Sequence, residues 1–379
     1  MDSSKRVIYF SRDYSTHDHR FLTSLSKTDY EVFYLRLENN NKFNPESSQL
    51  QNIQILPSLI QDSEFNFWKT PGIIKKIKSI LKEIKPDIIH AGPIQTCAFL
   101  IAMSKYPSLV SMSWGSDLLV DSEQNLIYNL ITQFTLKRTK VLLGDCNAVK
   151  EKAIKLGFPE KQIILFPWGI NLENFKPGRN LSLRKKLNWD EKFIILSLRS
   201  WERIYGVDVV AKAFANATKR EPGLRLLLLG NGSYSQVIHE IIRDAGVEDR
   251  IFYAGIIDQE ELPLYYQAAD LYISGSFSDG SSVSLMEALA TGTLVLVSDI
   301  PGNKEWIQPG ENGWLFSSGN VPDLENMILE IYRQREYFSK VSHNARATAE
   351  RKANWDINFS KLLLAYQQVL NTNLRMEGI

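Results

Sequence analysis

Cysteine and histidine are scarce in this chain, which has two cysteines and five histidines among 379 residues. Cys97 and Cys146 are too few for a disulfide framework or a zinc knuckle, and both lie in apolar runs. We therefore expect two inert core thiols in a reducing compartment. His17 and His19 are separated by one residue and have no evident third partner, so the sequence predicts no metal site.

A net charge of either sign is also lacking, because 44 basic residues balance 43 acidic ones and leave a formal charge of +1. Phosphate neutralisation requires a clear basic excess, so this balance argues against nucleic acid as the main partner. There is no N-terminal apolar segment with a cleavage site, and no apolar run approaches the roughly 18 residues of a membrane span. From these absences we expect a cytoplasmic protein.

Short apolar runs, by contrast, are abundant. They are nearly continuous in Ile, Leu and Val, which is typical of strands buried on both faces. Amphipathic segments such as residues 72–84 and 207–219 separate many of them, and this alternation predicts an α/β fold with parallel sheets. The expected strands are residues 6–10, 87–91, 109–114, 140–145, 163–169, 193–199, 224–230, 251–255, 271–276 and 294–299.

The polar stretch at residues 171–192 interrupts this alternation near the middle of the chain. It predicts a linker between two domains, which the length of the chain also favours. Each half would have its own sheet, with residues 1–175 in the first domain and 176–355 in the second. A ligand cleft is expected between the domains, at the carboxyl ends of strands.

The stretch FSDGSSVSLMEALATG, residues 277–292, carries two acids among small polar residues. It predicts a loop followed by a helix over 283–291, with Gly292 just after the helix end. Ser281 or Ser282 is the expected N-cap, and the amides of the first turn could bind a phosphate. Asp279 lies before the helix, and Glu287 lies within it.

Glu287 falls on a side of this helix that should be buried. An unpaired carboxylate there would cost several kcal/mol, so we expect a hydrogen-bond donor beside it. The two hydroxyl groups of a ribose would serve. A structural pairing with a nearby Arg or Lys fits the pattern equally well.

Residues 278–316, SDGSSVSLMEALATGTLVLVSDIPGNKEWIQPGENGWLF, resemble the donor-binding region of glycosyltransferase family 4. Those enzymes are retaining transferases that use nucleotide sugars. Their GT-B fold has two Rossmann-like domains whose parallel sheets face across a cleft, and a final helix, here 356–379, crosses back to the first domain. The family signature is two acids separated by seven residues. Asp279 stands where a Glu is usual, and Glu287 matches the second acid.

The resemblance implies a role for each donor-site residue. Asp279 would hold the hexose and Glu287 the ribose, while Gly255 and Ile256 would bind the nucleobase through backbone groups. The diphosphate would meet the segment from Gly280 through Ser281, Ser282, Val283 and Ser284 to Leu285.

Two basic side chains of the second domain complete the implied catalytic set. Arg199 matches a family Arg on the diphosphate, but Tyr205 occupies the position of the usual Lys. A phenol is neutral near pH 7, although it can donate one hydrogen bond. We expect Arg199 to stabilise the leaving group and Arg203 to supply the second charge; Arg203 could instead be a solvated loop residue.

The likeness extends through residues 148–177, 224–234 and 250–276, and it is looser in the first half. GNGSYS at 230–235 lacks the third glycine of a dinucleotide fingerprint, and the resemblance explains it as a family turn. A Gly-Gly loop common in the family is replaced by SRDYSTHDHRFL at 11–22, and a common His by WGSD at 114–117. In these two segments we expect five residues to contact the acceptor: His17, Asp18, His19, Trp114 and Asp117. The alternative is that they serve local hydrogen bonding or core packing.

The predicted reaction is transfer of a hexosyl unit, with retention, from a nucleotide sugar to a glycan or lipid-linked acceptor. UDP-glucose is the favoured donor, polysaccharide (exopolysaccharide) or glycolipid assembly the setting, and no cofactor is expected. A nucleotide-sugar isomerase or hydrolase, or a silent binding protein, remains as an alternative. One face of residues 72–85 is either simply solvated or attracted to an anionic membrane at its inner side, through Lys75, Lys76, Lys78, Lys82 and Lys85.

Overall fold

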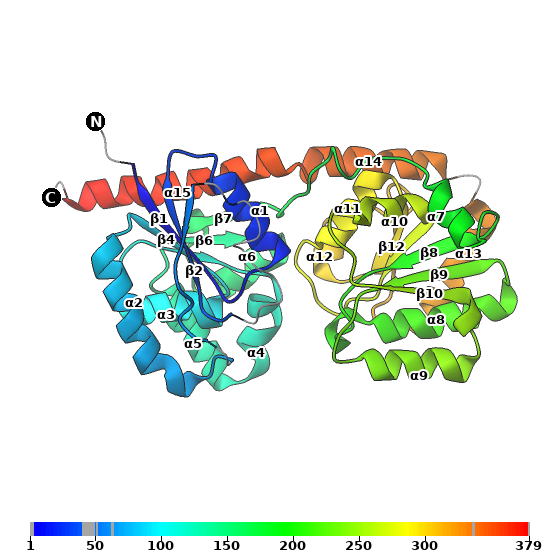
Figure 1. Ribbon diagram of the computed structural model, residues 1–379, viewed down its shortest axis with the longest axis horizontal. Coiled ribbons are helices and arrows are strands. Elements are labelled where there is room, and N and C mark those ends of the chain that lie inside the picture. The colour runs from blue at the N-terminus through cyan, green and yellow to red at the C-terminus, as the bar shows by residue number, and fades with distance from the viewer. Residues whose placement is uncertain (1–3, 40–49, 51, 62–63, 336–337, 378–379) are drawn as a thin grey trace. The chain divides into compact units, whose positions relative to one another are not determined.

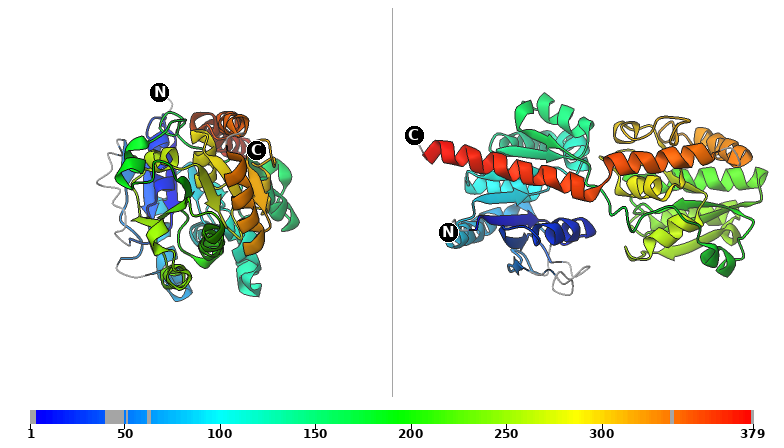
Figure 2. Two further views of the ribbon diagram at one scale, coloured as in Figure 1. Left: turned by 90° about the vertical axis from the view of Figure 1, so that its right-hand side faces the viewer. Right: turned by 90° about the horizontal axis from the view of Figure 1, so that it is seen from above.

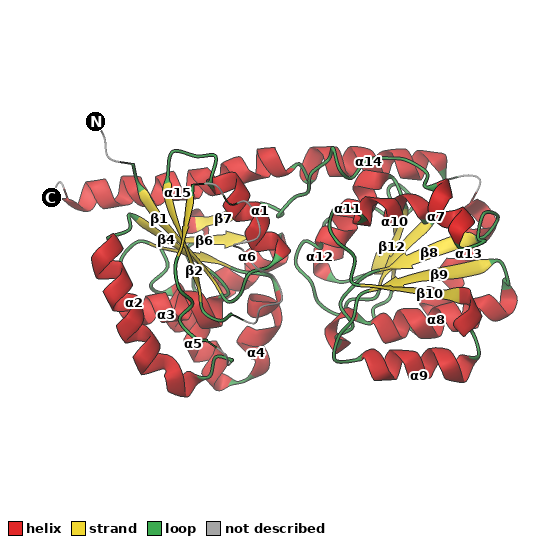
Figure 3. Cartoon of the chain, in the orientation of Figure 1, coloured by secondary structure: helices red, strands yellow, loops and turns green. Residues whose placement is uncertain are grey.

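The computed structural model describes residues 4–39, 50, 52–61, 64–335 and 338–377. Contacts within the chain divide it into two compact units (Figure 1). Unit 1 comprises Met1–Phe166 and Phe359–Ile379, and unit 2 comprises Pro167–Asn358. Each unit contains one parallel sheet with helices, which confirms the predicted α/β class (Figure 3).

The sheet of unit 1 has seven strands in the order β3-β2-β1-β4-β5-β6-β7. The strands are β1 Arg6–Ser11, β2 Glu31–Arg36, β3 Ile53–Ile55, β4 Ile88–Ala91, β5 Leu109–Met112, β6 Val141–Gly144 and β7 Ile163–Leu165. The helices are α1 Thr16–Leu25, η1 Phe67–Lys69, α2 Thr70–Ile84, η2 Ile94–Ala98, α3 Phe99–Ser104, η3 Asp117–Asp121, α4 Ser122–Gln124, α5 Leu126–Leu136, α6 Asn147–Lys155 and η4 Glu160–Gln162.

Helices cover both faces of this sheet (Figure 2). On one face α2 packs its apolar stripe Ile73, Ile77, Leu81 and Ile84, whose spacing is that of one side of a helix. On the other face lie α1 and the last helix, α15 Trp355–Glu377. Because strand side chains alternate in direction, a strand covered on both faces is buried along its length, as β4 is and as β1 is from Val7 onward.

The sheet of unit 2 has six strands in the order β10-β9-β8-β11-β12-β13. The strands are β8 Phe193–Ser197, β9 Leu224–Leu229, β10 Ile251–Gly255, β11 Leu271–Ser274, β12 Leu294–Ser298 and β13 Trp314–Phe316. The helices are α7 Leu181–Lys186, η5 Arg203–Tyr205, α8 Val207–Arg220, α9 Ser235–Ala245, η6 Glu248–Arg250, α10 Leu262–Ala268, α11 Val283–Thr291, α12 Pro301–Lys304, α13 Val321–Gln334 and α14 Ser339–Lys352.

Successive residues of β8 belong to different halves of the unit 2 core. Ile195 packs with α8, α9 and α13, whereas Ile194 and Leu196 pack with α10, α11 and α14. All pairings in this sheet are parallel, so every strand ends at the same edge. The loops that follow β8, β11 and β12 therefore converge at the carboxyl edge of the sheet.

All ten predicted strands are present, but three strands lie outside the predicted set. β2 has the sequence EVFYLR, which lacks the run of Ile, Leu and Val on which the prediction relied, and β3 and β13 have three residues each. The predicted polar linker also contains a helix, α7. Arg184 of α7 is fully buried and donates to the carbonyl of Ala268, so this helix packs as part of unit 2.

Candidate functional site

The stretch with the two predicted acids forms the connection from β11 to α11 and α11 itself. The helix covers Val283–Thr291, and Gly292 ends it with a φ of 68°, as predicted. Ser282 is the N-cap residue, but its side chain makes no capping hydrogen bond. Its hydroxyl accepts a hydrogen bond from Arg199 instead. The first-turn amides of α11 are thus not capped by Ser282.

Two glycines let the loop after β8 lie directly against the loop after β11. Gly206 has a φ of 58°, and a Cβ on it would lie 2.2 Å from the carbonyl oxygen of Gly275. A Cβ on Gly275 would lie 2.5 Å from the carbonyl oxygen of Gly206. Only glycine allows this approach, which brings the loop with Arg199 and Tyr205 beside Asp279.

Arg199 is the centre of this group. One terminal nitrogen, Nη2, lies 2.8 Å from Oδ2 of Asp279, and both side chains are less than one-fifth exposed. The other, Nη1, donates to the hydroxyl of Ser282 at 3.0 Å and to that of Ser284 at 3.3 Å. The guanidinium carbon lies 4.2 Å from the centroid of the Tyr205 ring, which is cation–π geometry. Arg199 therefore faces the start of α11, as the phosphate role requires.

The Asp279 carboxylate compensates this cation. Burial, the largest influence, lowers the pKa of Arg199, but attraction to Asp279 and then Tyr205 outweighs it, so the pKa is raised. Asp279 also accepts a 3.0 Å hydrogen bond from the amide of Gly280 through Oδ1. The guanidinium stays charged, and the pair has no net charge. An anionic ligand would have to compete with Asp279 for the cation.

Glu287 is 2% exposed, which confirms that this acid lies on a buried side of α11. Tyr266 of α10 donates its hydroxyl hydrogen to Oε2 at 2.9 Å. Gln259, in the loop before α10, donates from Nε2 to Oε1 at 3.0 Å. The expected donor is thus supplied, at least in part, by a phenol and an amide rather than by an Arg or Lys.

Ser284, in the first turn of α11, connects the two acids, and a second tyrosine, Tyr272, also contacts it. The hydroxyls of Tyr272 and Ser284 are 2.7 Å apart, and Ser284 also accepts from Arg199. The backbone carbonyl of Ser284 accepts from Tyr266 at 2.9 Å. A continuous set of contacts therefore leads from Asp279 through Arg199 and Ser284 to Tyr266 and Glu287.

The remaining predicted donor-site residues lie around this set. Ser281 accepts from the indole of Trp306 at 3.3 Å, and Leu285 is fully buried. Gly255 ends β10, and its carbonyl accepts from the amide of Gly230 at 2.7 Å, whereas the Ile256 side chain is 77% exposed. Val283 begins α11 and is half-buried. Arg203 is exposed in η5, and no contact with Arg199 supports the predicted second charge.

In unit 1, Asp18 serves its own helix. It is the third residue of α1 and forms a capping box with Ser15, in which its carboxylate accepts from the Ser15 amide. The hydroxyl of Tyr9 donates to its other oxygen at 3.0 Å. Burial raises the pKa of Asp18 to about 6, although the hydrogen bonds from Ser15, Tyr9 and Ser11 oppose the rise. These contacts favour the local hydrogen-bonding alternative over an acceptor contact.

The aromatic residues near Asp18 remain accessible. The rings of His17 and Trp114 lie 5.5 Å apart, and both side chains are half-buried. His19 is exposed, with Nδ1 2.6 Å from the Tyr14 hydroxyl, and burial followed by repulsion from Arg20 lowers its pKa. These three side chains are at least partly exposed, and their acceptor role stays a prediction.

Asp117 resembles Asp18 rather than Asp279. It is 3% exposed and accepts hydrogen bonds from the amides of Ile94 and Leu118 and the hydroxyl of Ser113. Burial raises its pKa, and these hydrogen bonds oppose the rise. Its carboxylate holds together the starts of η2 and η3, which again favours a structural role.

Sequence reasoning missed Tyr266, Tyr272 and Gln259. The sequence signal for them was indirect. A carboxylate on the buried side of α11 requires hydrogen-bond donors, but it does not indicate which residues supply them. Tyr266 and Tyr272 lie in apolar surroundings that look like core sequence, and both are fully buried. Burial, followed by the charge of Glu287, raises the pKa of Tyr266, so this phenol keeps the proton it donates.

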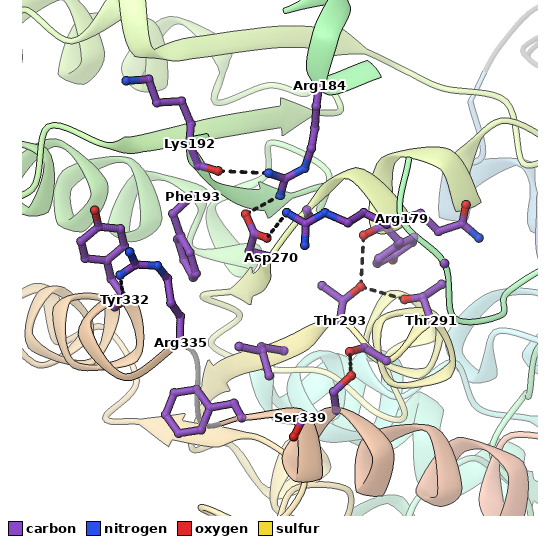
Figure 4. Close-up of a pocket in the computed structure, with 18 of the residues that line it drawn as sticks. Arg179, Arg184, Lys192, Phe193, Asp270, Thr291, Thr293, Tyr332, Arg335 and Ser339 are labelled. Atoms are coloured by element: carbon purple, nitrogen blue, oxygen red, sulfur yellow. Dashed lines mark hydrogen bonds and ion pairs between the residues drawn. The ribbon is translucent and has the colours of Figure 1, made fainter. Parts of the chain in front are cut away.

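A cavity of about 530 Å³ lies at the opposite edge of the unit 2 sheet, where strands begin with Phe193 and Leu294 (Figure 4). Two of its arginines engage one carboxylate: Arg184 donates to Asp270, and Arg179 lies 3.9 Å from the same group. Among the described residues that line it there is none of the predicted site residues. The candidate site is therefore at the carboxyl edge, where the predicted residues converge.

Within the described ranges, no three His, Cys, Asp or Glu side chains are grouped so that they could hold a metal ion. In the same part of the chain, no helix combines the length and apolar character that crossing a membrane requires. Both cysteines are buried, as expected.

Two protein-family models match the chain, one in each unit. The model for glycosyl transferase 4-like proteins matches residues 6–145, and that for glycosyl transferases group 1 matches residues 180–348. Together the two matches take in most of the chain.

Two curated relatives match about half of the chain at 22% and 32% sequence identity. The GDP-mannose-dependent alpha-(1-6)-phosphatidylinositol monomannoside mannosyltransferase of Mycobacterium tuberculosis is 22% identical over 213 residues, which are 54% of this chain and 55% of that protein. Alpha-monoglucosyldiacylglycerol synthase of Streptococcus pneumoniae is 32% identical over 179 residues, 45% of this chain and 39% of that protein. The chain thus spans about half the length of the curated relatives it matches, or less.

Among solved structures, Anabaena HepE in complex with UDP-glucose superposes with a TM-score of 0.80 at 16% sequence identity. The match covers 98% of this chain and 99% of that one. At this identity the likeness concerns the fold.

Proposed function

Since this chain belongs to glycosyltransferase family 4, whose fold is GT-B, we propose that it transfers a sugar from a nucleotide-activated donor to a hydroxyl group of an acceptor. The observation that carries the proposal is the grouping of Arg199, Asp279 and Glu287 around the start of α11. A cation and a helix start can receive a diphosphate, and two flanking carboxylates can receive sugar hydroxyls.

Each group then has one task. Arg199 and the amides of Ser282 to Leu285 take the diphosphate, and their charge stabilises the leaving group as it departs. Oε1 of Glu287, the oxygen that accepts from Gln259, binds a ribose hydroxyl. Backbone groups near Gly255 bind the base. When the diphosphate pairs with the Arg199 guanidinium, Asp279 leaves that ion pair and binds the hexose. No resident metal is required, so turnover should persist in EDTA.

The favoured donor is UDP-glucose, and transfer proceeds with retention of the anomeric configuration. A solved structure of the same fold holds UDP-glucose, which supports the choice, whereas a relative's name specifies GDP-mannose. The acceptor would be a glycan or a lipid-linked sugar in polysaccharide or glycolipid assembly. The name of the streptococcal relative, a glucosyldiacylglycerol synthase, supports the lipid option.

A membrane partner is the second element of the proposal, and exposed side chains of unit 1 support it. Trp68, directly before α2, is 94% exposed, and Leu126, Ile127 and Leu130 of α5 are all more than half exposed. These segments are neighbours, because the rings of Phe67 and Tyr128 lie 6.3 Å apart. α2 also presents exposed Lys75, Lys76, Lys78, Lys82 and Lys85, and lysines beside apolar side chains suit an anionic bilayer.

Vesicle flotation tests the membrane partner. Vesicles with phosphatidylglycerol should bind the protein, and vesicles of phosphatidylcholine alone should not. Trp68→Ala should weaken the binding severalfold, while Trp189→Phe, a buried change in unit 2, should leave it unaltered. Equal binding to both kinds of vesicle would contradict the charge argument.

One alternative keeps a specific observation in its favour. Asp279 compensates Arg199 and a neutral Tyr205 stands at the lysine position, so the site has less positive charge than a diphosphate prefers. A silent nucleotide-sugar-binding protein would tolerate this deficit. An isomerase or hydrolase of the same architecture would react without an acceptor.

The deciding experiment is a binding panel followed by a transfer assay. UDP, GDP and ADP, and then their sugars, should raise the melting temperature unequally, with the UDP series strongest. Glu287→Gln should lower the affinity for the preferred nucleotide, because it removes a charge-assisted acceptor worth ~1.5–3 kcal/mol. Asp279→Asn should lower turnover, while free nucleotide should bind at least as tightly as before because a charge that competes for Arg199 is removed. Sugar release that does not depend on an acceptor would favour the hydrolase.

A further inference from the structure

We propose that two neighbouring donors divide the Glu287 carboxylate between them. Tyr266 is a positioning residue that binds the inner oxygen, Oε2, permanently. Gln259 is a replaceable donor that binds the outer oxygen, Oε1, until ligand hydroxyls displace it. The inference rests on the proposed role of Glu287 in nucleotide binding. It places within the site a side chain that competes with the ligand.

Tyr266 is built to stay in position. Its side chain is fully buried, and its ring packs against Phe175 at 5.9 Å and Tyr272 at 6.0 Å between centroids. Its hydroxyl lies 2.9 Å from both Oε2 of Glu287 and the carbonyl oxygen of Ser284. Both acceptors belong to α11, three residues apart, so one hydroxyl fixes the Glu287 rotamer relative to the helix backbone.

The backbone of Tyr266 is held as well. Its carbonyl oxygen accepts from the hydroxyl of Thr293 at 3.1 Å, and Thr293 follows α11 directly. The hydroxyl of Thr291, in the last turn of α11, lies 2.9 Å from that of Thr293. α10 and α11 are thus joined at both ends of the Tyr266 side chain, and a ligand cannot displace this donor without separating the two helices.

Gln259 differs in each respect. It is an exposed residue of the loop between β10 and α10, and its amide reaches Oε1 of Glu287 at 3.0 Å. An exposed side chain can rotate into water and regain hydrogen bonds there. A ligand hydroxyl that reaches Oε1 must first displace this amide.

The two donors should therefore affect binding in opposite directions. Tyr266→Phe removes the inner donor from a buried carboxylate, so nucleotide should bind about tenfold more weakly. Gln259→Ala removes the competitor, so the same nucleotide should bind roughly threefold more tightly. Loss of a contact ordinarily weakens binding, and a gain from truncation is the signature of competition.

Isothermal titration with UDP, or with whichever of UDP, GDP and ADP the wild type binds best, measures these changes. The 2′-deoxy nucleotide is the second probe. Since Gln259 competes with ribose hydroxyls, Gln259→Ala should improve binding of the ribonucleotide more than that of the deoxy form. A merely structural role would leave the ratio of the two affinities unchanged.

Matched controls are present in the chain. Tyr265→Phe makes the same change one residue away, and Gln236→Ala removes an amide that donates to Glu240 at 2.9 Å on α9. Both should bind nucleotide as the wild type does. If Tyr266→Phe lowers the melting temperature too far to titrate, Gln259→Ala, an exposed substitution, still decides the question.

The outcomes separate the inference from the proposed function. If Glu287→Gln leaves nucleotide affinity unchanged, the ribose assignment itself is wrong. If Glu287→Gln weakens binding but Gln259→Ala weakens it too or matches the Gln236 control, Gln259 is no competitor and the inference falls. Weaker ribonucleotide binding by Tyr266→Phe together with tighter binding by Gln259→Ala would establish the division.

Discussion

The two units place acids at the carboxyl edges of their sheets, yet these acids have different partners. In unit 1, Asp18 and Asp117 accept hydrogen bonds from backbone amides as well as hydroxyls. In unit 2, Glu287 accepts from the side chains of Tyr266 and Gln259, and Asp279 pairs with the Arg199 side chain in addition to accepting from the amide of Gly280. A backbone partner cannot leave without undoing a turn, whereas an exposed side-chain partner can rotate away. Unit 2 therefore has the groups that a ligand can engage.

Removing the Arg199 cation of unit 2 should have the largest effect on turnover. Arg199→Ala should cost about 10²–10³ in turnover, the scale for losing one preorganised charge-stabilising group. Steady-state kinetics with saturating donor measures it. Arg203→Ala, the control in the exposed part of the same loop, should lose far less. Equal losses in the two variants would mean that Arg199 has no special part in leaving-group stabilisation.

Asp18, a buried acid of unit 1, should make the free energy of unfolding depend on pH. The folded-state pKa of Asp18 is raised from 3.8 to about 6, so its protonated form favours folding, and stability is lost as pH rises through that interval. The rise corresponds to ~3 kcal/mol. Asn does not titrate, so urea unfolding should show Asp18→Asn gaining up to about that amount relative to wild type between about pH 4 and about pH 7. A difference that is constant with pH would refute the raised pKa.

Asp117→Asn tests whether Asp117 has a structural role in unit 1. The substitution turns an amide group toward the backbone N–H of Ile94 or Leu118, so two donors face each other at a cost of ~1–3 kcal/mol. The melting temperature should fall, while the KM for acceptor stays at the wild-type value. A rise in acceptor KM with an unchanged melting temperature would restore Asp117 to the acceptor site.

The smallest effects should come from Tyr205. Tyr205→Phe keeps the ring beneath the Arg199 guanidinium, so turnover should stay within about threefold of wild type. Tyr205→Lys gives up the ring but adds a second cation near the diphosphate, and turnover should rise. A Lys variant slower than the Phe variant would mean that ring stacking matters more here than charge.

Much of the fold was predictable because its causes are local. Apolar runs such as FIILS report burial on both faces of a parallel sheet without reference to any distant residue. The helix over 283–291 and its glycine end follow from periodicity and from the left-handed conformation that Gly292 adopts. β2 escaped prediction because two of its four apolar residues are aromatic and because charged residues bound them.

The sequence by itself determined the parallel-sheet units, the helix with Glu287 on its buried side, and the need of that carboxylate for donors. Only the tertiary structure decided which donors these are, because Tyr266 and Gln259 reach Glu287 from 21 and 28 residues away. It also decided that Arg199 pairs with Asp279, while Asp18 and Asp117 are bound into their own turns. A residue type states what bonds a side chain can make, but the packing of separate strands and loops selects the partner.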